Sequence, residues 1–70
     1  MHTTEWRVIT IDDILERVEN CELPASFPVD LEDIDYIHYR LNKRIYGRIG
    51  RNKIHFSKDP DRNKIWVYER

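Results

Sequence analysis

Apolar residues recur at different spacings along this chain, and these spacings predict its secondary structure. Residues 5–10, "EWRVIT", partly alternate apolar and polar side chains, which predicts a short strand. Apolar residues then recur at three- and four-residue steps, which predicts a helix from Ile11 to Asn20. Thr10 begins a T-x-x-D sequence with Asp13, a pattern typical of a helix N-terminus.

Two prolines interrupt the pattern in residues 21–29, "CELPASFPV". Proline cannot donate a backbone hydrogen bond, so this segment is predicted to be a loop. Its apolar residues Leu23, Phe27 and Val29 are expected to lie against the core.

A second, longer helix is predicted from Asp30, which would cap it, to Tyr46, where Gly47 and Gly50 offer exits. Acidic residues crowd its first turns and basic residues lie toward its end, as the helix dipole favours. Its apolar stripe consists of Ile34, Ile37, Leu41 and Ile45.

The last predicted element is a β-hairpin over residues 53–69, with a four-residue loop from Pro60 to Asn63. This loop pairs Asp59 with Lys64 and so determines which side chains share a face. One face would carry Ile54, Phe56, Ile65 and Val67, and the other Lys53, His55, Trp66 and Tyr68. A loop longer or shorter by one residue would instead turn Trp66 and Tyr68 toward the core.

Together these elements predict an α+β fold, a single domain over residues 1–70 with a short N-terminal strand, two helices and a C-terminal β-hairpin. The composition agrees, since 40% of the 70 residues are hydrophobic and 36% are charged. Cys21 is the only cysteine, which excludes an internal disulfide and suits a reducing compartment. No apolar run reaches transmembrane length and residues 1–10 lack the apolar core of a secretory signal, so we expect no membrane contact and a cytoplasmic protein.

Charge is distributed very unevenly between the two halves of the chain. Residues 1–35 contain two bases and ten acids, a net of −8, whereas residues 36–70 contain ten bases and three acids, a net of +7. Such asymmetry suggests an anionic partner for the basic half. The alternative is that the two halves pack together and neutralise each other.

Candidate catalytic and metal-binding residues are sparse. The three histidines and Cys21 show none of the close spacings of zinc ligands, and His38 at the edge of the apolar stripe suits a packed histidine. Paired acids such as Asp12 and Asp13 lie in helix first turns, where capping explains them. Residues 47–50, "GRIG", have too few glycines for a dinucleotide-binding motif. We therefore predict no enzyme, no catalytic residue, no metal and no cofactor.

Aromatic residues are predicted on two outward surfaces, the second helix and the outer face of the hairpin. They are Tyr36, Tyr39 and Tyr46 on the helix and Trp66 and Tyr68 on the hairpin. Exposed tyrosine is frequent in binding hot spots and can also contact nucleic acids. Alternatively, the 22–29 loop or the first strand covers some of the tyrosines.

The order strand, helix, loop, basic helix and basic hairpin resembles the winged-helix DNA-binding domains, over residues 11–20, 30–46 and 53–69. The likeness lies in arrangement and charge. In that family the second or third helix enters the major groove, and the hairpin, or wing, contacts the backbone or the minor groove. The resemblance implies helix contacts by Arg40, Lys43, Arg44 and Arg48, and wing contacts by Arg51, Lys53, Lys58, Arg62 and Lys64.

Most winged helices have three helices, whereas this sequence predicts two, and in this respect it looks more like the compact excisionase-type and MerR-type variants. The departure leaves open which helix reads bases.

Two functions follow as hypotheses. The first is a small nucleic-acid-binding regulator of transcription that contacts double-stranded DNA through its basic half. The second is a protein-binding inhibitor or adaptor of the kind that phages and other mobile elements encode, which would grip a host protein through its tyrosines, Trp66 and its acidic first helix. The oligomeric state is left open, a homodimer included.

Overall fold

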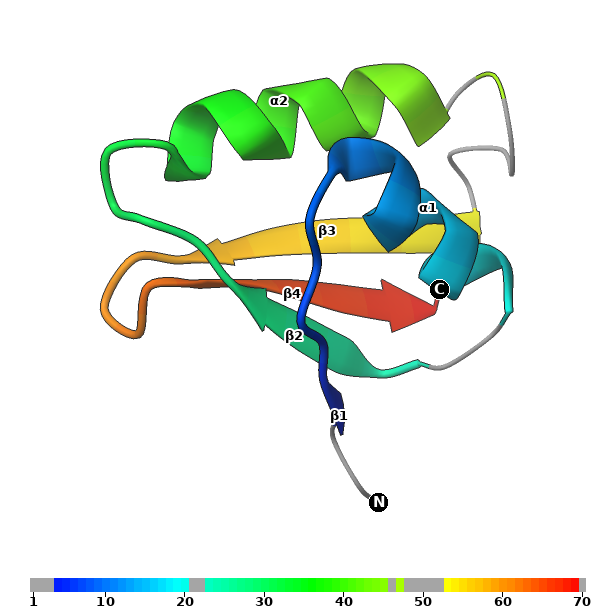
Figure 1. Ribbon diagram of the computed structural model, residues 1–70, viewed down its shortest axis with the longest axis horizontal. Coiled ribbons are helices and arrows are strands. Elements are labelled where there is room, and N and C mark those ends of the chain that lie inside the picture. The colour runs from blue at the N-terminus through cyan, green and yellow to red at the C-terminus, as the bar shows by residue number, and fades with distance from the viewer. Residues whose placement is uncertain (1–3, 21–22, 46, 48–52, 70) are drawn as a thin grey trace.

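The fold is a small α+β unit in which two helices cover a four-stranded sheet (Figure 1). It was obtained as a computed structural model that describes residues 4–20, 23–45, 47 and 53–69. The elements are β1 (Thr4–Glu5), α1 (Ile11–Glu19), β2 (Ala25–Pro28), α2 (Ile34–Ile45), β3 (Ile54–Asp59) and β4 (Lys64–Glu69). The predicted fold class, with its N-terminal strand, two helices and closing hairpin, is confirmed.

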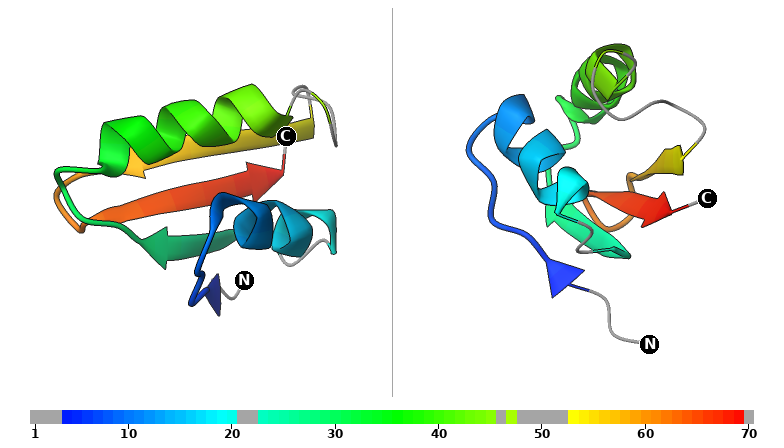
Figure 2. Two further views of the ribbon diagram at one scale, coloured as in Figure 1. Left: turned by 45° about the horizontal axis from the view of Figure 1, so that its top comes forward. Right: turned by 90° about the vertical axis from the view of Figure 1, so that its right-hand side faces the viewer.

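The sheet has the strand order β1-β2-β4-β3, with β1 parallel to β2 and every other pair antiparallel. Both helices lie on one side of it, which is clearest when the molecule is seen end-on (Figure 2). Within the described residues, the opposite side of the sheet carries no helix. This one-sided arrangement decides which residues of the hairpin become core and which become surface.

The predicted hairpin register is confirmed. Asp59 pairs with Lys64, and the loop residue Asn63 has a positive φ of 54°. Ile65 and Val67 are completely buried on the helix side, whereas His55 and Tyr68 are exposed on the other side. Because side chains alternate along a strand, the four-residue loop was sufficient to assign every residue of the hairpin to a face.

The loop predicted for residues 21–29 is wrong over residues 25–28, which form β2. This strand pairs with β4 along its whole length, placing Ala25 beside Val67 and Phe27 beside Ile65. Phe27 is buried, as expected for it in any conformation, and Leu23 and Val29 pack partly buried against the same core. The hairpin therefore does not stand alone as a wing, because β2 continues its sheet.

Backbone direction explains how a strand with flanking prolines can pair. The carbonyl groups of Pro24 and Ser26 accept hydrogen bonds from the amides of Thr4 and Trp6, so these residues face β1. Residues two apart in a strand point the same way, so Pro28 also directs its nitrogen away from β4. The prolines thus interrupt no bond between β2 and β4, and Val29 continues that ladder with a 2.9 Å bond to the Asn63 carbonyl.

Three predicted boundaries also differ from the structure. The first strand covers Thr4–Glu5 rather than residues 5–10, although the buried Trp6 extends its bonding by one residue, with 2.7 Å between its amide and the Ser26 carbonyl. The first helix ends one residue early, at Glu19, and its Thr10 hydroxyl caps the Asp13 amide at 3.2 Å as predicted.

The second helix begins at Ile34 rather than directly after Asp30. Residues 31–33 form a turn instead, in which the Asp33 amide donates to the Asp30 carbonyl at 2.9 Å. The last residue of α2 is Ile45, and the predicted end at Tyr46 lies outside the described residues.

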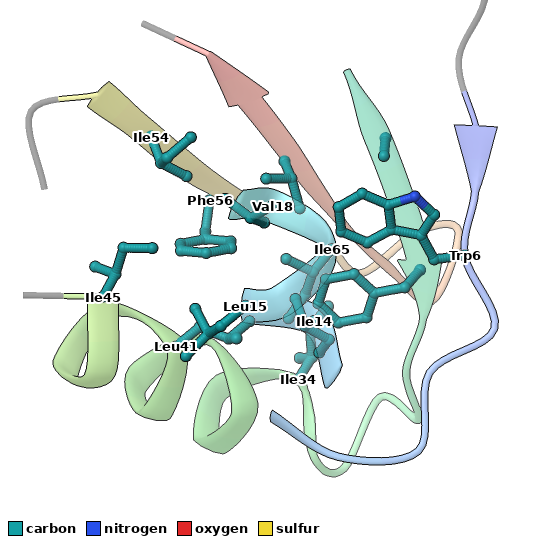
Figure 3. Packing of buried hydrophobic residues seen from close by; sticks show 13 residues of the cluster. Trp6, Ile14, Leu15, Val18, Ile34, Leu41, Ile45, Ile54, Phe56 and Ile65 are labelled. Atoms are coloured by element: carbon teal, nitrogen blue, oxygen red, sulfur yellow. The ribbon is translucent and has the colours of Figure 1, made fainter. Parts of the chain in front are cut away.

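The core fills the space between the helices and the inner face of the sheet (Figure 3). Every element except β1 contributes to it, and Trp6 closes it beside β2. Its members are Trp6, Ile14, Leu15, Val18, Ala25, Phe27, Ile34, Leu41, Ile45, Ile54, Phe56, Ile65 and Val67. The predicted stripe of the second helix is buried except for Ile37, which is half-buried.

Candidate functional site

An aromatic row occupies the helix-free face of the sheet. His55 of β3 and Tyr68 of β4 are directly paired, with ring centroids 6.3 Å apart and an interplanar angle of 24°. Tyr68 in turn lies 6.3 Å from Trp66, with the rings at 15° to each other. Tyr68 is 40% exposed, His55 is exposed and Trp66 is half-buried. The three near-parallel rings, His55, Tyr68 and Trp66, are called the aromatic row below.

Polar contacts hold one end of the aromatic row in place. The indole N–H of Trp66 donates to the Asp59 carboxylate at 3.0 Å, and this bond, with a smaller contribution from Arg62, lowers the pKa of Asp59 below its ordinary value of 3.8. The ammonium group of Lys64 lies 5.8 Å from the centre of the Trp66 ring and also pairs with Glu5 of β1. Trp66 therefore has its edge bonded and part of its ring beside a cation.

A second aromatic surface runs along the outside of α2. Tyr36 and Tyr39 are 58% and 56% exposed, as predicted from helical geometry. Arg40 donates to the Tyr36 hydroxyl at 2.7 Å, and Lys43 donates to the Tyr39 hydroxyl at 3.3 Å. Each cation also lies 5.6 Å from the centre of the same tyrosine ring. These four-residue pairs support the helix and leave the tyrosines accessible.

The acidic half of the chain neutralises part of the basic half. Arg44 of α2 pairs with Asp12 of α1 at 2.5 Å, and Lys58 of β3 pairs with Asp35 of α2 at 2.8 Å. The hydrogen bond from Lys58, together with its charge, lowers the pKa of Asp35 below 3.8. With the pair between Lys64 and Glu5, three ion pairs among the described residues join the two halves, so packing neutralises part of the asymmetry seen in the sequence.

The remaining predicted contact residues fall into three groups. Arg62 pairs within the hairpin with Asp59, at 3.3 Å. Arg40, Lys43 and Lys53 form no ion pair with any described residue. Lys53 is exposed directly before β3 and so lies at the start of the strand that carries His55. Outside the described residues lie Tyr46, Arg48 and Arg51.

Sequence reasoning missed an apolar groove beside the hairpin turn. It has a volume of about 690 Å³ and lies between residues 8–11, the end of β2, the start of α2 and the hairpin turn. The one signal in the sequence was Ile9, an apolar residue at a position with no partner in the strand pattern, which is 92% exposed in the structure.

His38 has a structural role in the described part of the chain. Its Nε2 atom lies 3.1 Å from the Phe56 carbonyl. The Asn42 side chain contacts the His38 ring and donates to the His38 carbonyl. The histidine thus occupies a backbone acceptor on β3, a strand at the edge of the sheet. Among the residues that the structure places, no three His, Cys, Asp or Glu side chains gather as metal ligands.

Comparison with known proteins assigns no family to the chain: no family model, no curated protein and no solved structure matched it. Within the described ranges, neither helix combines the length and apolar character needed to cross a membrane. The winged-helix resemblance stays a prediction of the sequence.

Proposed function

We propose that this protein binds nucleic acid through the helix-free face of its sheet, with single-stranded segments as the preferred ligand. The observation that carries the proposal is the aromatic row, which lies on a sheet face that no helix covers. Planar side chains on an open sheet can stack on unpaired bases, a contact available to every base.

Cations stand at both ends of the aromatic row. Lys64, which also pairs with Glu5, flanks Trp66 at one end, and Lys53 precedes the strand that brings His55 to the other. Stacked bases leave their phosphates at the edge of the binding surface, where lysine ammonium groups attract them. Duplex DNA, which the sequence favoured, keeps its bases paired and would have to bind through charge on α2 instead.

Tryptophan fluorescence tests this proposal directly. The variant Trp6→Phe leaves Trp66 as the only indole, and titration at low salt compares a mixed-sequence single-stranded DNA with its duplex. We expect the single strand to quench or shift Trp66 emission, and the duplex to bind more weakly. Substitution of Tyr68 by Thr should weaken single-strand binding about tenfold, because stacking contributes about 1–3 kcal/mol per base.

The matched control is Tyr39→Thr, which removes an exposed tyrosine from α2 and should leave affinity unchanged. A different outcome would move the interface to α2. The protein would then bind the duplex without any change in Trp66 emission, and replacing Arg40 and Lys43 would abolish that binding. Binding of neither ligand at low salt would exclude both forms of the proposal.

A further inference from the structure

The apolar groove is the place where the core of this protein opens to solvent. Ile14 and Phe27, both buried, form its floor. Among the described residues, five partly buried hydrophobic side chains pack against the core, and four of them, Val8, Ile11, Val29 and Ile37, line this one groove. Incomplete burial is therefore concentrated at a single site rather than spread over the surface.

Exposed apolar and aromatic side chains extend the groove outward. Ile9 and Tyr36, which are 92% and 58% exposed, both line it. A contiguous apolar surface of this kind in a soluble domain marks an interaction site. Its volume of about 690 Å³ and its open rim suit a few side chains of an extended or helical peptide.

Charge at the rim restricts what can enter. Asp30 and Asp33 line the groove and form no ion pair with any described residue. The one cation in the lining, Arg62, is already paired with Asp59. The acidic rim repels phosphates and anionic lipid headgroups and attracts lysine or arginine.

We propose that the groove binds a segment of a partner protein that carries apolar side chains flanked by basic residues. The apolar side chains would cover Val8, Ile11, Val29 and Ile37, and the basic flank would meet Asp30 and Asp33. This site is separate from the aromatic row and independent of nucleic-acid binding. It extends the alternative hypothesis of a protein partner to a surface with defined chemistry.

Selection from a random displayed-peptide library tests the chemistry of the occupant without assuming its sequence. We expect enriched peptides to combine apolar positions with adjacent lysine or arginine. A synthetic copy of an enriched peptide should perturb the methyl NMR signals of Val8, Ile11, Val29 and Ile37 while leaving the aromatic row unaffected.

Two variants locate the contact without disturbing the fold. Ile9→Ser changes a side chain that is almost fully exposed and should weaken the peptide roughly tenfold, since burial of an isoleucine is worth at least that factor. Replacing both Asp30 and Asp33 by Asn should remove the preference for basic flanks, because it removes two negative charges while the side chains keep nearly the same shape. The controls Tyr39→Thr and Glu16→Gln alter exposed residues outside the groove and should leave peptide affinity unchanged.

Three results would overturn the proposal. Enrichment of acidic peptides, or of none, would show that the occupant has other chemistry. Peptides that bind the Ile9→Ser variant as tightly as the unaltered protein would show that the contact lies elsewhere. A concentration-dependent dimer, detected by light scattering and dissociated by Ile9→Ser, would identify a second copy of this chain as the occupant.

Discussion

Trp6 is the largest buried side chain at the edge of the core, and its indole N–H meets no acceptor among the described residues. An unpaired buried donor costs free energy, which offsets part of the stabilisation from burying the ring. We therefore expect Trp6→Phe to lower the free energy of unfolding by only about 1 kcal/mol, because phenylalanine fills much of the space without a donor.

Urea unfolding followed by circular dichroism measures this difference. Trp6→Ala serves as the comparison and should cost about 3–5 kcal/mol, the usual range for removing a large aromatic side chain. Equal losses in the two variants would mean that the indole N–H is satisfied in solution.

The protonation state of Asp59 affects its hydrogen bond to Trp66 of the aromatic row. The hydrogen bond from Trp66 lowers the pKa of this carboxyl below 3.8 in the folded protein, so its stabilising contribution is complete above pH 3.8 and is lost as the pH falls through the folded value. The NMR signal of the Trp66 indole N–H should therefore shift with a midpoint below pH 3.8. Asp59→Asn should abolish that shift and Asp61→Asn should retain it, whereas a midpoint at or above pH 3.8 would contradict the contact.

Among the elements, the hairpin depends most on one backbone conformation. Asn63 has a φ of 54°, and its carbonyl also accepts the bond from Val29 that continues the ladder to β2. Valine disfavours positive φ, so Asn63→Val should lower the free energy of unfolding by about 1–2 kcal/mol. Asn63→Gly should change it by less than about 1 kcal/mol.

Chemical denaturation of the three proteins measures these differences, with Asp61→Val as a control in the same turn. A loss for Asp61→Val as large as that for Asn63→Val would mean that β propensity or solubility, rather than backbone conformation, sets the cost.

For the whole molecule, neutralisation of one half by the other determines how strongly salt should affect nucleic-acid binding. The resemblance assigned nine bases to DNA contact, and of the seven that the structure describes, four form ion pairs with acids: Arg44, Lys58, Arg62 and Lys64. A single strand that meets one or two cations outside these ion pairs gives a slope of log affinity against log salt of about −1, whereas nine contacts to duplex DNA would give about −8. Anisotropy titrations over a range of salt concentrations distinguish these values.

The ion pair between Glu5 and Lys64 provides a second test of how the two halves neutralise each other. Glu5 binds Lys64 beside the aromatic row, so Glu5→Gln should release that lysine for a phosphate. We expect tighter single-strand binding at low salt and a slope steeper by about 0.7, the contribution of one phosphate. Glu16→Gln makes the same change of charge on α1, and an equal gain in that variant would attribute the effect to net charge alone.

By itself the sequence determined the features that depend on local chemistry. Helical spacing placed both apolar stripes, Thr10 identified the first cap, and the residues of one turn, Pro60 to Asn63, assigned the faces of the whole hairpin. The outward position of Trp66 and Tyr68 followed from this assignment, because these residues must point outward once Ile65 and Val67 point inward.

Only the tertiary structure decided the features that depend on residues distant in the chain. The prolines Pro24 and Pro28 made β2 look like a loop in the sequence. Whether a proline interrupts a strand depends on which neighbouring strand it faces, and β1 and β4 are placed beside β2 only by the fold. The ion pairs between Arg44 and Asp12 and between Lys58 and Asp35 required α2 to lie between α1 and β3, so the sequence could count the charges but not their neutralisation. The apolar groove likewise exists only where four separate segments meet, and no local pattern describes such a meeting.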